Sequence, residues 1–216
     1  MKQSLKSVCA LFFLPFLLSM ILAGCLGRTK APYVVDHYTL EYSPPRKTYA
    51  SEVVNEFIRV ERFSVTPAFN TTAMVVKTHP YRYETYNYSR WRINPSDMVS
   101  SFILRDITRA GIFKATYSAY DTDLARYIID GHVDEFCEFA ESTPAQVTLG
   151  VRITFIDMEE KNPVDQIIFQ KHYVYSVPVT ERSPGGMAMA MSAAMEDLSN
   201  DLIGDIRLAL EERTGQ

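Results

Sequence analysis

A regular alternation of apolar and polar side chains over residues 127–179 constrains the fold of this chain more than any other feature. From residue 127 onward most apolar side chains share one parity, and the polar side chains of the other parity are Asp130, His132, Asp134 and Glu138. Period-two alternation is typical of a strand with one buried face. It resumes over residues 146–158 and 165–179, after breaks that contain Pro144 and Pro163. The pattern predicts a meander of long antiparallel strands, with Glu138 on the polar face.

Two helices are expected beside this meander. The first begins after Asn94, whose side chain can accept hydrogen bonds from first-turn amides, and ends near residue 110, before Gly111. The second runs from Gly185-Gly186 to the C-terminus. Its apolar stripe has spacings of three and four and consists of Met187, Met191, Met195, Leu198, Leu202, Ile206 and Leu210. A helix with one such stripe usually packs on the sheet of its own domain.

Shorter strands are predicted upstream, over residues 34–42, 56–65, 74–77, 81–88 and 113–119. The order is strands, helix, strands, helix, without regular strand–helix alternation. This order favours the α+β class: a single domain over residues 34–213, with a mostly antiparallel sheet and helices packed on one face.

The N-terminal segment reads as a bacterial lipoprotein signal peptide over residues 1–24. Lys2 and Lys6 precede an apolar run, and Leu22-Ala23-Gly24 lead directly to Cys25. The alternative is a transmembrane helix, but the run contains Pro15 and is shorter than the roughly 20 residues a span needs. We therefore expect cleavage before Cys25.

Cys25 is then the expected acylation site, with a diacylglycerol on its thiol and a further acyl chain, such as palmitate, on its amine. Two or three chains anchor a protein durably, because each buried methylene contributes about 0.8 kcal/mol. Leu26 stands where an aspartate would favour the inner membrane, so the periplasmic face of the outer membrane is expected. Residues 25–33 form the lipidated N-terminus and tether.

Charge and cysteine content limit the remaining options. Removing residues 1–24 takes away two of the 22 basic side chains and none of the 26 acidic ones, so 20 basic and 26 acidic side chains leave a formal charge of −6. This acidic excess argues against nucleic acid and fits basic partners or simple solubility. Cys137 is the one cysteine left unmodified, and its parity predicts a buried apolar role rather than a nucleophile.

The most enzyme-like pattern is the row Asp130, His132 and Asp134, which a strand would place on one face. A metal-dependent hydrolase is the functional reading, and an exposed polar strand face is the simpler one. No phosphate loop, nucleophile elbow or paired zinc-ligand motif occurs in the sequence. We expect no enzyme activity, no bound metal and no cofactor apart from the lipid on Cys25.

The densest group of aromatic and arginine side chains is the candidate partner-binding segment, which contains Tyr81, Tyr83, Tyr86, Tyr88, Arg90, Trp91 and Arg92. These residue types are enriched at protein–protein interfaces. The tyrosines change parity between Tyr83 and Tyr86, so a bulge or bend is expected and some members must pack on the core.

Several short segments in this order resemble the ABC-type transport auxiliary lipoprotein family, the PqiC-like group. They are Tyr38-Thr39-Leu40, residues 58–63, Met74-Val75, His79-Pro80-Tyr81, residues 86–91 and residues 129–136. The resemblance implies a periplasmic, lipid-anchored accessory that docks or supports the outer-membrane end of a lipid conduit. The implied partners are an MCE-domain protein and, through it, an ABC transporter permease and ATPase, or a neighbouring copy of the chain.

A second reading is a lipoprotein that carries an acyl chain in its own cavity, under the methionine-rich helix.

Overall fold

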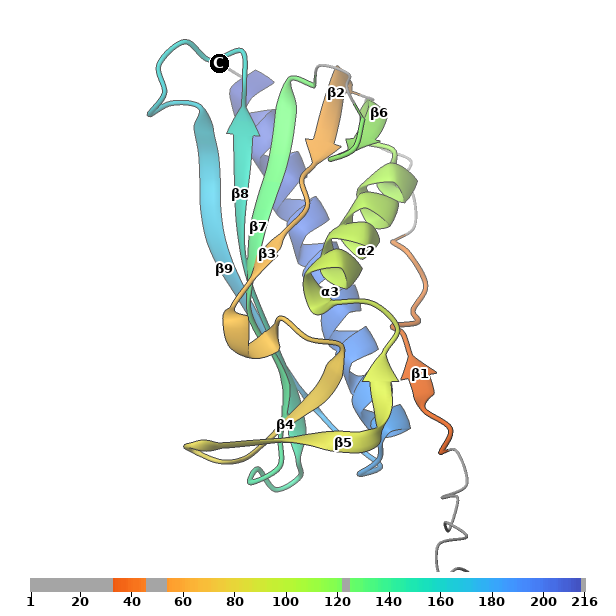
Figure 1. Ribbon diagram of the computed structural model, residues 1–216. Coiled ribbons are helices and arrows are strands. Elements are labelled where there is room, and N and C mark those ends of the chain that lie inside the picture. Colours follow the sequence, from red (N-terminus) through yellow and green to blue (C-terminus); the bar gives the residue numbers. More distant parts are fainter. Residues whose placement is uncertain (1–32, 46–53, 122–124, 215–216) are drawn as a thin grey trace, which may run out of the picture. The chain divides into compact units, whose positions relative to one another are not determined.

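The alternation over residues 127–179 produces three long strands, β7 (Tyr127–Phe139), β8 (Gln146–Asp157) and β9 (Ile167–Pro178). They pair as the predicted antiparallel meander, with β8 between β7 and β9 (Figure 1). The computed structural model describes residues 33–45, 54–121 and 125–214. The predicted signal peptide, Cys25 and all but the end of the predicted tether lie outside these described residues. One compact unit begins at Val35 and contains the strands and helices that follow.

The other strands complete a mixed sheet around β7. They are β1 (Asp36–Tyr38), β2 (Val54–Val60), β3 (Ser64–Val65), β4 (Ala73–His79), β5 (Arg82–Trp91) and β6 (Phe113–Ser118), with a short 3₁₀ helix η1 (Pro67–Phe69) after β3. In the described part of the chain the sheet has nine strands, in the order β1-β5-β4-β7-β2-β6, and β8 and β9 extend it from β7. The two longest ladders, β7–β8 and β8–β9, are antiparallel.

Strands β2, β3 and β4 pair with β7 in parallel, at successive levels along its length. β2 pairs at Tyr127–Ile129, β3 at His132 and Val133, and β4 at Glu138 and Phe139. The single strand predicted over residues 56–65 is therefore divided into β2 and β3. The fold is α+β, as predicted, with a mixed sheet.

Both predicted helices are present. In α2 (Pro95–Ala110) Asn94 caps the N-terminus by accepting from the Ser96 amide at 3.1 Å, and Gly111 ends the helix with φ 63°. In α3 (Pro184–Thr214) the stripe methionines Met187, Met191 and Met195 are completely buried against the sheet. Neither helix has the length and apolar composition required to cross a membrane within the described residues.

Polar contacts fasten the helices in place. Tyr173 and Tyr175 on β9 donate to Asp205 and Asp201 of α3, each at 2.6 Å. Between the helices, buried Asp106 accepts hydrogen bonds from Tyr42 and Ser199, at 2.5 and 2.6 Å. A buried carboxylate is tolerated when hydrogen bonds satisfy it. The helices are thus joined both to the sheet and to each other.

Two irregularities change which side chains face the core. The β7–β8 register shifts between Val133 and Glu135. The β4–β5 register shifts between Ala73 and Val75, whose partners on β5 are Arg90 and Thr85. The second shift is the bulge that the tyrosine parity predicted. The first places both Phe136 and Glu138 in the interior. The expected polar-face position of Glu138 is therefore wrong, because the bulge resets the alternation and the β4–β5 hairpin covers this end of β7.

Candidate functional site

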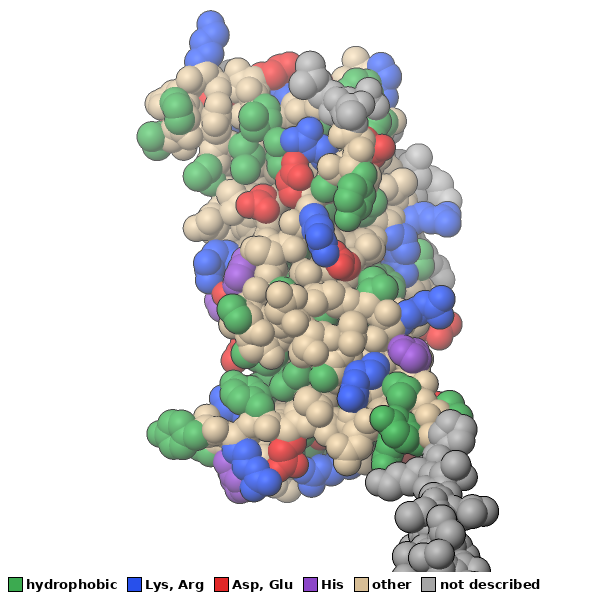
Figure 2. Space-filling view, in the orientation of Figure 1, with side chains coloured by type: hydrophobic (Ala, Val, Ile, Leu, Met, Phe, Trp, Pro, Cys, Tyr) green, Lys and Arg blue, Asp and Glu red, His purple; other side chains and the backbone are tan. Residues whose placement is uncertain are grey.

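The hairpin formed by β4 and β5 presents aromatic side chains to solvent. Tyr81, at the turn, is 98% exposed, and Tyr83 and Tyr88 are also exposed on β5. Tyr83 makes an edge contact with Phe69 and lies near the Lys77 ammonium. Hydrophobic side chains stand at the tip of this hairpin with charged side chains beside them (Figure 2). Exposed tyrosines with neighbouring basic groups are typical of protein-binding surfaces.

The remaining members of the candidate segment have different surroundings. Trp91 is buried and packs edge-on against Phe136, with ring centroids 5.3 Å apart, so it belongs to the core. Arg90 is half-buried and donates to the carbonyl oxygens of Tyr86 and Ser89. Arg92 is exposed. The structure therefore divides the segment into an exposed group, Tyr81, Tyr83, Tyr88 and Arg92, and a group that supports the hairpin.

Tyr86 belongs to a pocket on the other face of the hairpin. Register places Glu84, Val76 and Glu138 side by side on β5, β4 and β7, so their side chains share one face. The pocket has a volume of about 290 Å³, and we call it the Glu138 pocket; it is lined by Val76, Thr78, Glu84, Thr85, Tyr86, Glu138 and Arg182.

The electrostatics of the Glu138 pocket are acidic and partly unsatisfied. Glu138 is 0% exposed, and its Oε2 accepts from the Tyr86 hydroxyl at 3.0 Å. Burial, followed by the Glu138 charge and hydrogen bond, raises the pKa of Tyr86 to about 12, so Tyr86 remains a donor at physiological pH. Oε1 of Glu138 accepts no hydrogen bond from the described residues, and Nε of Arg182 lies 3.8 Å away.

Sequence reasoning missed this pocket. The one local signal was the consecutive apolar pair Phe136-Cys137, which breaks the alternation immediately before Glu138. Cys137 is buried as predicted, and burial raises the pKa of its thiol to about 12. A thiol with so high a pKa is a poor nucleophile.

The row Asp130, His132 and Asp134 forms a polar network on the sheet. His132 interacts with the hydroxyls of Ser64 and Thr66 at 2.7 and 3.2 Å, and Asp130 accepts from the Gly131 amide. Asp134 pairs with Arg152 at 2.9 Å and lies 3.4 Å from His172. Among the residues described, no group of three or more histidine, cysteine or acidic side chains has the arrangement of a metal site.

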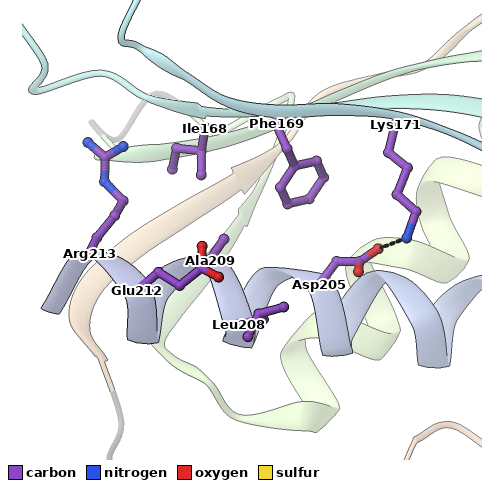
Figure 3. Close-up of a pocket in the computed structure, with 8 residues that line it drawn as sticks. All are labelled: Ile168, Phe169, Lys171, Asp205, Leu208, Ala209, Glu212 and Arg213. Carbon is purple, nitrogen blue, oxygen red and sulfur yellow. Dashed lines mark hydrogen bonds and ion pairs between the residues drawn. The ribbon is translucent and has the colours of Figure 1, made fainter. Parts of the chain in front are cut away.

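A separate groove lies between β9 and the last turns of α3 (Figure 3). It has a volume of about 420 Å³, and its apolar side chains are Ile168, Phe169, Leu208 and Ala209. Charged side chains border it, including the Lys171–Asp205 ion pair at 2.6 Å. The second reading placed an acyl-chain cavity under the methionine-rich helix. The stripe methionines of that helix are buried in the core, and the groove lies beside its last turns.

Comparison with solved structures supports the fold. A protein from Xanthomonas campestris of the DUF330 family superposes with a TM-score of 0.69 at 14% identity, covering 85% of this chain and 100% of that one. An uncharacterized protein gives a TM-score of 0.63 at 10% identity, with coverage of 80% and 99%. No curated protein sequence matches the chain.

The family model for the ABC-type transport auxiliary lipoprotein component matches residues 38–202, which include all the strands from β2 to β9 and most of α3. DUF330 is the same family. The family is a class of transport accessory components rather than a known class of enzymes, and its name indicates association with an ABC transport system and a membrane-associated, periplasmic location. The chain therefore belongs to the ABC-type transport auxiliary lipoprotein component family.

Proposed function

We propose that this chain is an outer-membrane lipoprotein that docks an MCE-domain protein of an ABC-type lipid transport system through the β4–β5 hairpin. The lipid on Cys25 would hold the domain at the periplasmic face. Its role is to hold or support the outer-membrane end of the conduit, whereas ATP hydrolysis belongs to a partner.

The observation that carries the docking role is the exposure of the hairpin tyrosines. Tyr81 is almost fully exposed although a tyrosine ring gains free energy by burial, and Tyr83 and Tyr88 are exposed on the same hairpin. Trp91 and Phe136 beneath the hairpin hold it on the core. A supported hairpin with exposed tyrosines is suited to bury them against another protein.

The test is site-specific photo-crosslinking in cells that express the full chain. A photoreactive residue replaces Tyr81, and Tyr120 is the matched control because it is a tyrosine that is 82% exposed outside the hairpin. We expect an adduct with an MCE-domain protein from position 81 and little from position 120. Equal yields at the two positions, or no adduct from position 81, would count against docking through the hairpin. An adduct with a second copy alone would assign the hairpin to self-association.

The second candidate, a lipid carrier, is favoured by one feature, the groove between β9 and α3. Its apolar wall of Ile168, Phe169 and Leu208 could contact an acyl chain. Native mass spectrometry of the purified, non-acylated chain should then detect a bound lipid that Leu208→Glu removes. Detection of the unliganded protein alone would exclude this candidate and leave docking unaffected.

A further inference from the structure

Glu138 is a buried acid with one oxygen that lacks a hydrogen bond. Tyr86 satisfies Oε2, but Oε1 has no donor within the described residues. Nε of Arg182, at 3.8 Å, is outside hydrogen-bond range. A buried polar atom without a partner carries a desolvation cost that the rest of the fold must offset. The Glu138 carboxyl group therefore has unused capacity for a donor.

The Glu138 pocket gives such a donor access. Glu84 and Glu138 lie on either side of Val76, two strand spacings or about 10 Å apart. Glu84 is exposed, and it already pairs with Arg82 at 2.7 Å. Arg182 is 64% exposed and is attached to the segment between β9 and α3, so it can leave the pocket without disturbing the core. The carboxylates favour a cation, and Arg182 is the local group that a cation would displace.

We infer that the Glu138 pocket binds an arginine side chain of the protein that docks on the hairpin, with its guanidinium donating to Oε1 of Glu138. The identity of that protein rests on the proposed function, whereas the arginine follows from the pocket. A guanidinium is more weakly hydrated than an ammonium group and presents several donors in one plane. It can therefore satisfy Oε1 while its plane lies against the Tyr86 ring.

A protein is favoured over a lipid amine as the source of the cation. Tyr83 and Tyr88 are exposed on β5, so the strand that contributes Glu84 and Tyr86 to the pocket also presents aromatic side chains to solvent, as at protein interfaces. The pocket walls include Thr78 and Thr85 rather than a continuous apolar channel. An acyl chain attached to a lipid headgroup would find little apolar contact there.

The experiment is an NMR titration of the purified mature chain carrying Cys25→Ser, followed through backbone amides. The probe is N-acetylarginine amide, and N-acetylnorleucine amide is the uncharged control. We expect saturable shifts of the Val76, Tyr86 and Glu138 amides with the arginine probe alone. Glu138→Gln, which preserves shape but removes the charge, should abolish saturation. Absence of saturable shifts, or equal affinity in Glu138→Gln, would overturn the inference.

Arg182→Ala provides an independent test, because this exposed side chain is not needed for packing. If Arg182 competes for Glu138, its removal should tighten binding of the arginine probe about two- to fivefold, the worth of an exposed ion pair. Unchanged or weaker binding would contradict competition.

A titration with phosphoethanolamine tests a lipid headgroup as the source of the cation. Saturable binding of phosphoethanolamine without binding of the arginine probe would also overturn the assignment.

The outcome can be separated from that of the docking proposal. Photo-crosslinking from position 81 in the Glu138→Gln chain should give less MCE-domain adduct than in the native chain. Undiminished crosslinking would reject the arginine pocket while leaving hairpin docking intact. Arginine binding to the isolated chain without any adduct from position 81 would reject docking alone.

Discussion

Gly131 shows how one residue can be required by a packing contact. It lies in the middle of β7, and a Cβ atom built on it would overlap the ring of Phe63, which is itself buried. Its backbone dihedral φ is not positive, so the requirement comes from the space that the ring occupies. This glycine lies in the segment over residues 129–136 that resembles the family pattern. The structure shows why a glycine is needed there: the Phe63 ring occupies the space of a side chain.

Gly131→Ala should therefore destabilise the protein by about 1–3 kcal/mol, because a new methyl group forces the Phe63 ring out of a packed position. Urea unfolding at neutral pH measures this free energy. Gly204→Ala is the matched control, since no atom lies within 4 Å of its added Cβ. Gly204 is inside α3, where alanine should stabilise by about 0.5–1 kcal/mol. If Gly131→Ala is as stable as the native chain, the ring does not fill this position in solution.

At the scale of elements, Asp157 joins three parts of the chain that are distant in sequence. It ends β8, and its buried carboxylate accepts two hydrogen bonds at 3.0 Å from Arg126, which directly precedes β7. Arg213 near the end of α3 approaches the same carboxylate at 3.4 Å. Burial alone would raise the pKa of Asp157, but hydrogen bonds from Arg126 and the Glu159 amide, with the charges of Arg126 and Arg213, outweigh it and hold the pKa below its ordinary value.

Asp157→Asn should accordingly destabilise the protein at pH 7 by about 2–4 kcal/mol, because Arg126 and Arg213 lose the one buried carboxylate among their acidic partners in the described part of the chain. A lowered pKa means that the stabilisation is complete above the unfolded value near 4 and is lost as the pH falls below it. The difference in unfolding free energy between native and variant chains should then narrow between pH 5 and pH 3, measured by urea unfolding at each pH. If the difference in unfolding free energy stays constant over this range, the ion pairs of Asp157 are not its cause. Asp165→Asn, at an exposed loop position, is the control expected to change stability by less than about 0.5 kcal/mol.

The elements that the sequence predicted well are those with local signals. The alternation located β7, β8 and β9, and the Asn94 cap and Gly111 located both ends of α2. Parallel pairing along β7 joins segments up to about 70 residues apart, so no local sequence pattern predicts it. The bulge after Val133 interrupts the alternation, and extending the alternation past it assigns Glu138 to the wrong face. Of the candidate binding segment, composition identified the exposed tyrosines, but only packing showed that Trp91 is core.

At the scale of the whole molecule, the domain has a polar surface network, an acidic pocket and no membrane-spanning helix within its described residues. In the proposed function, the acyl chains predicted at Cys25 hold the domain at the membrane. Each chain of about 15 methylenes contributes roughly 10 kcal/mol, and two or three together make release negligible. Under the proposed function the predicted tether would set how far the hairpin can reach from the bilayer, so anchoring and docking would act together although they involve different residues.

Two substitutions test lipid attachment and the choice between the inner and outer membrane separately. Cys25→Ser should move the chain from the membrane pellet to the soluble periplasmic fraction, because no acyl chain can be attached. Leu26→Asp should keep the lipid but shift the chain from the outer-membrane to the inner-membrane band of a sucrose gradient, since an aspartate after the lipidated cysteine favours retention there. Both variants leave residues 33–214 unchanged, so the purified domains should unfold with the same midpoint in urea. Membrane association of Cys25→Ser, or an unshifted Leu26→Asp band, would mean that a different part of the molecule determines where it resides.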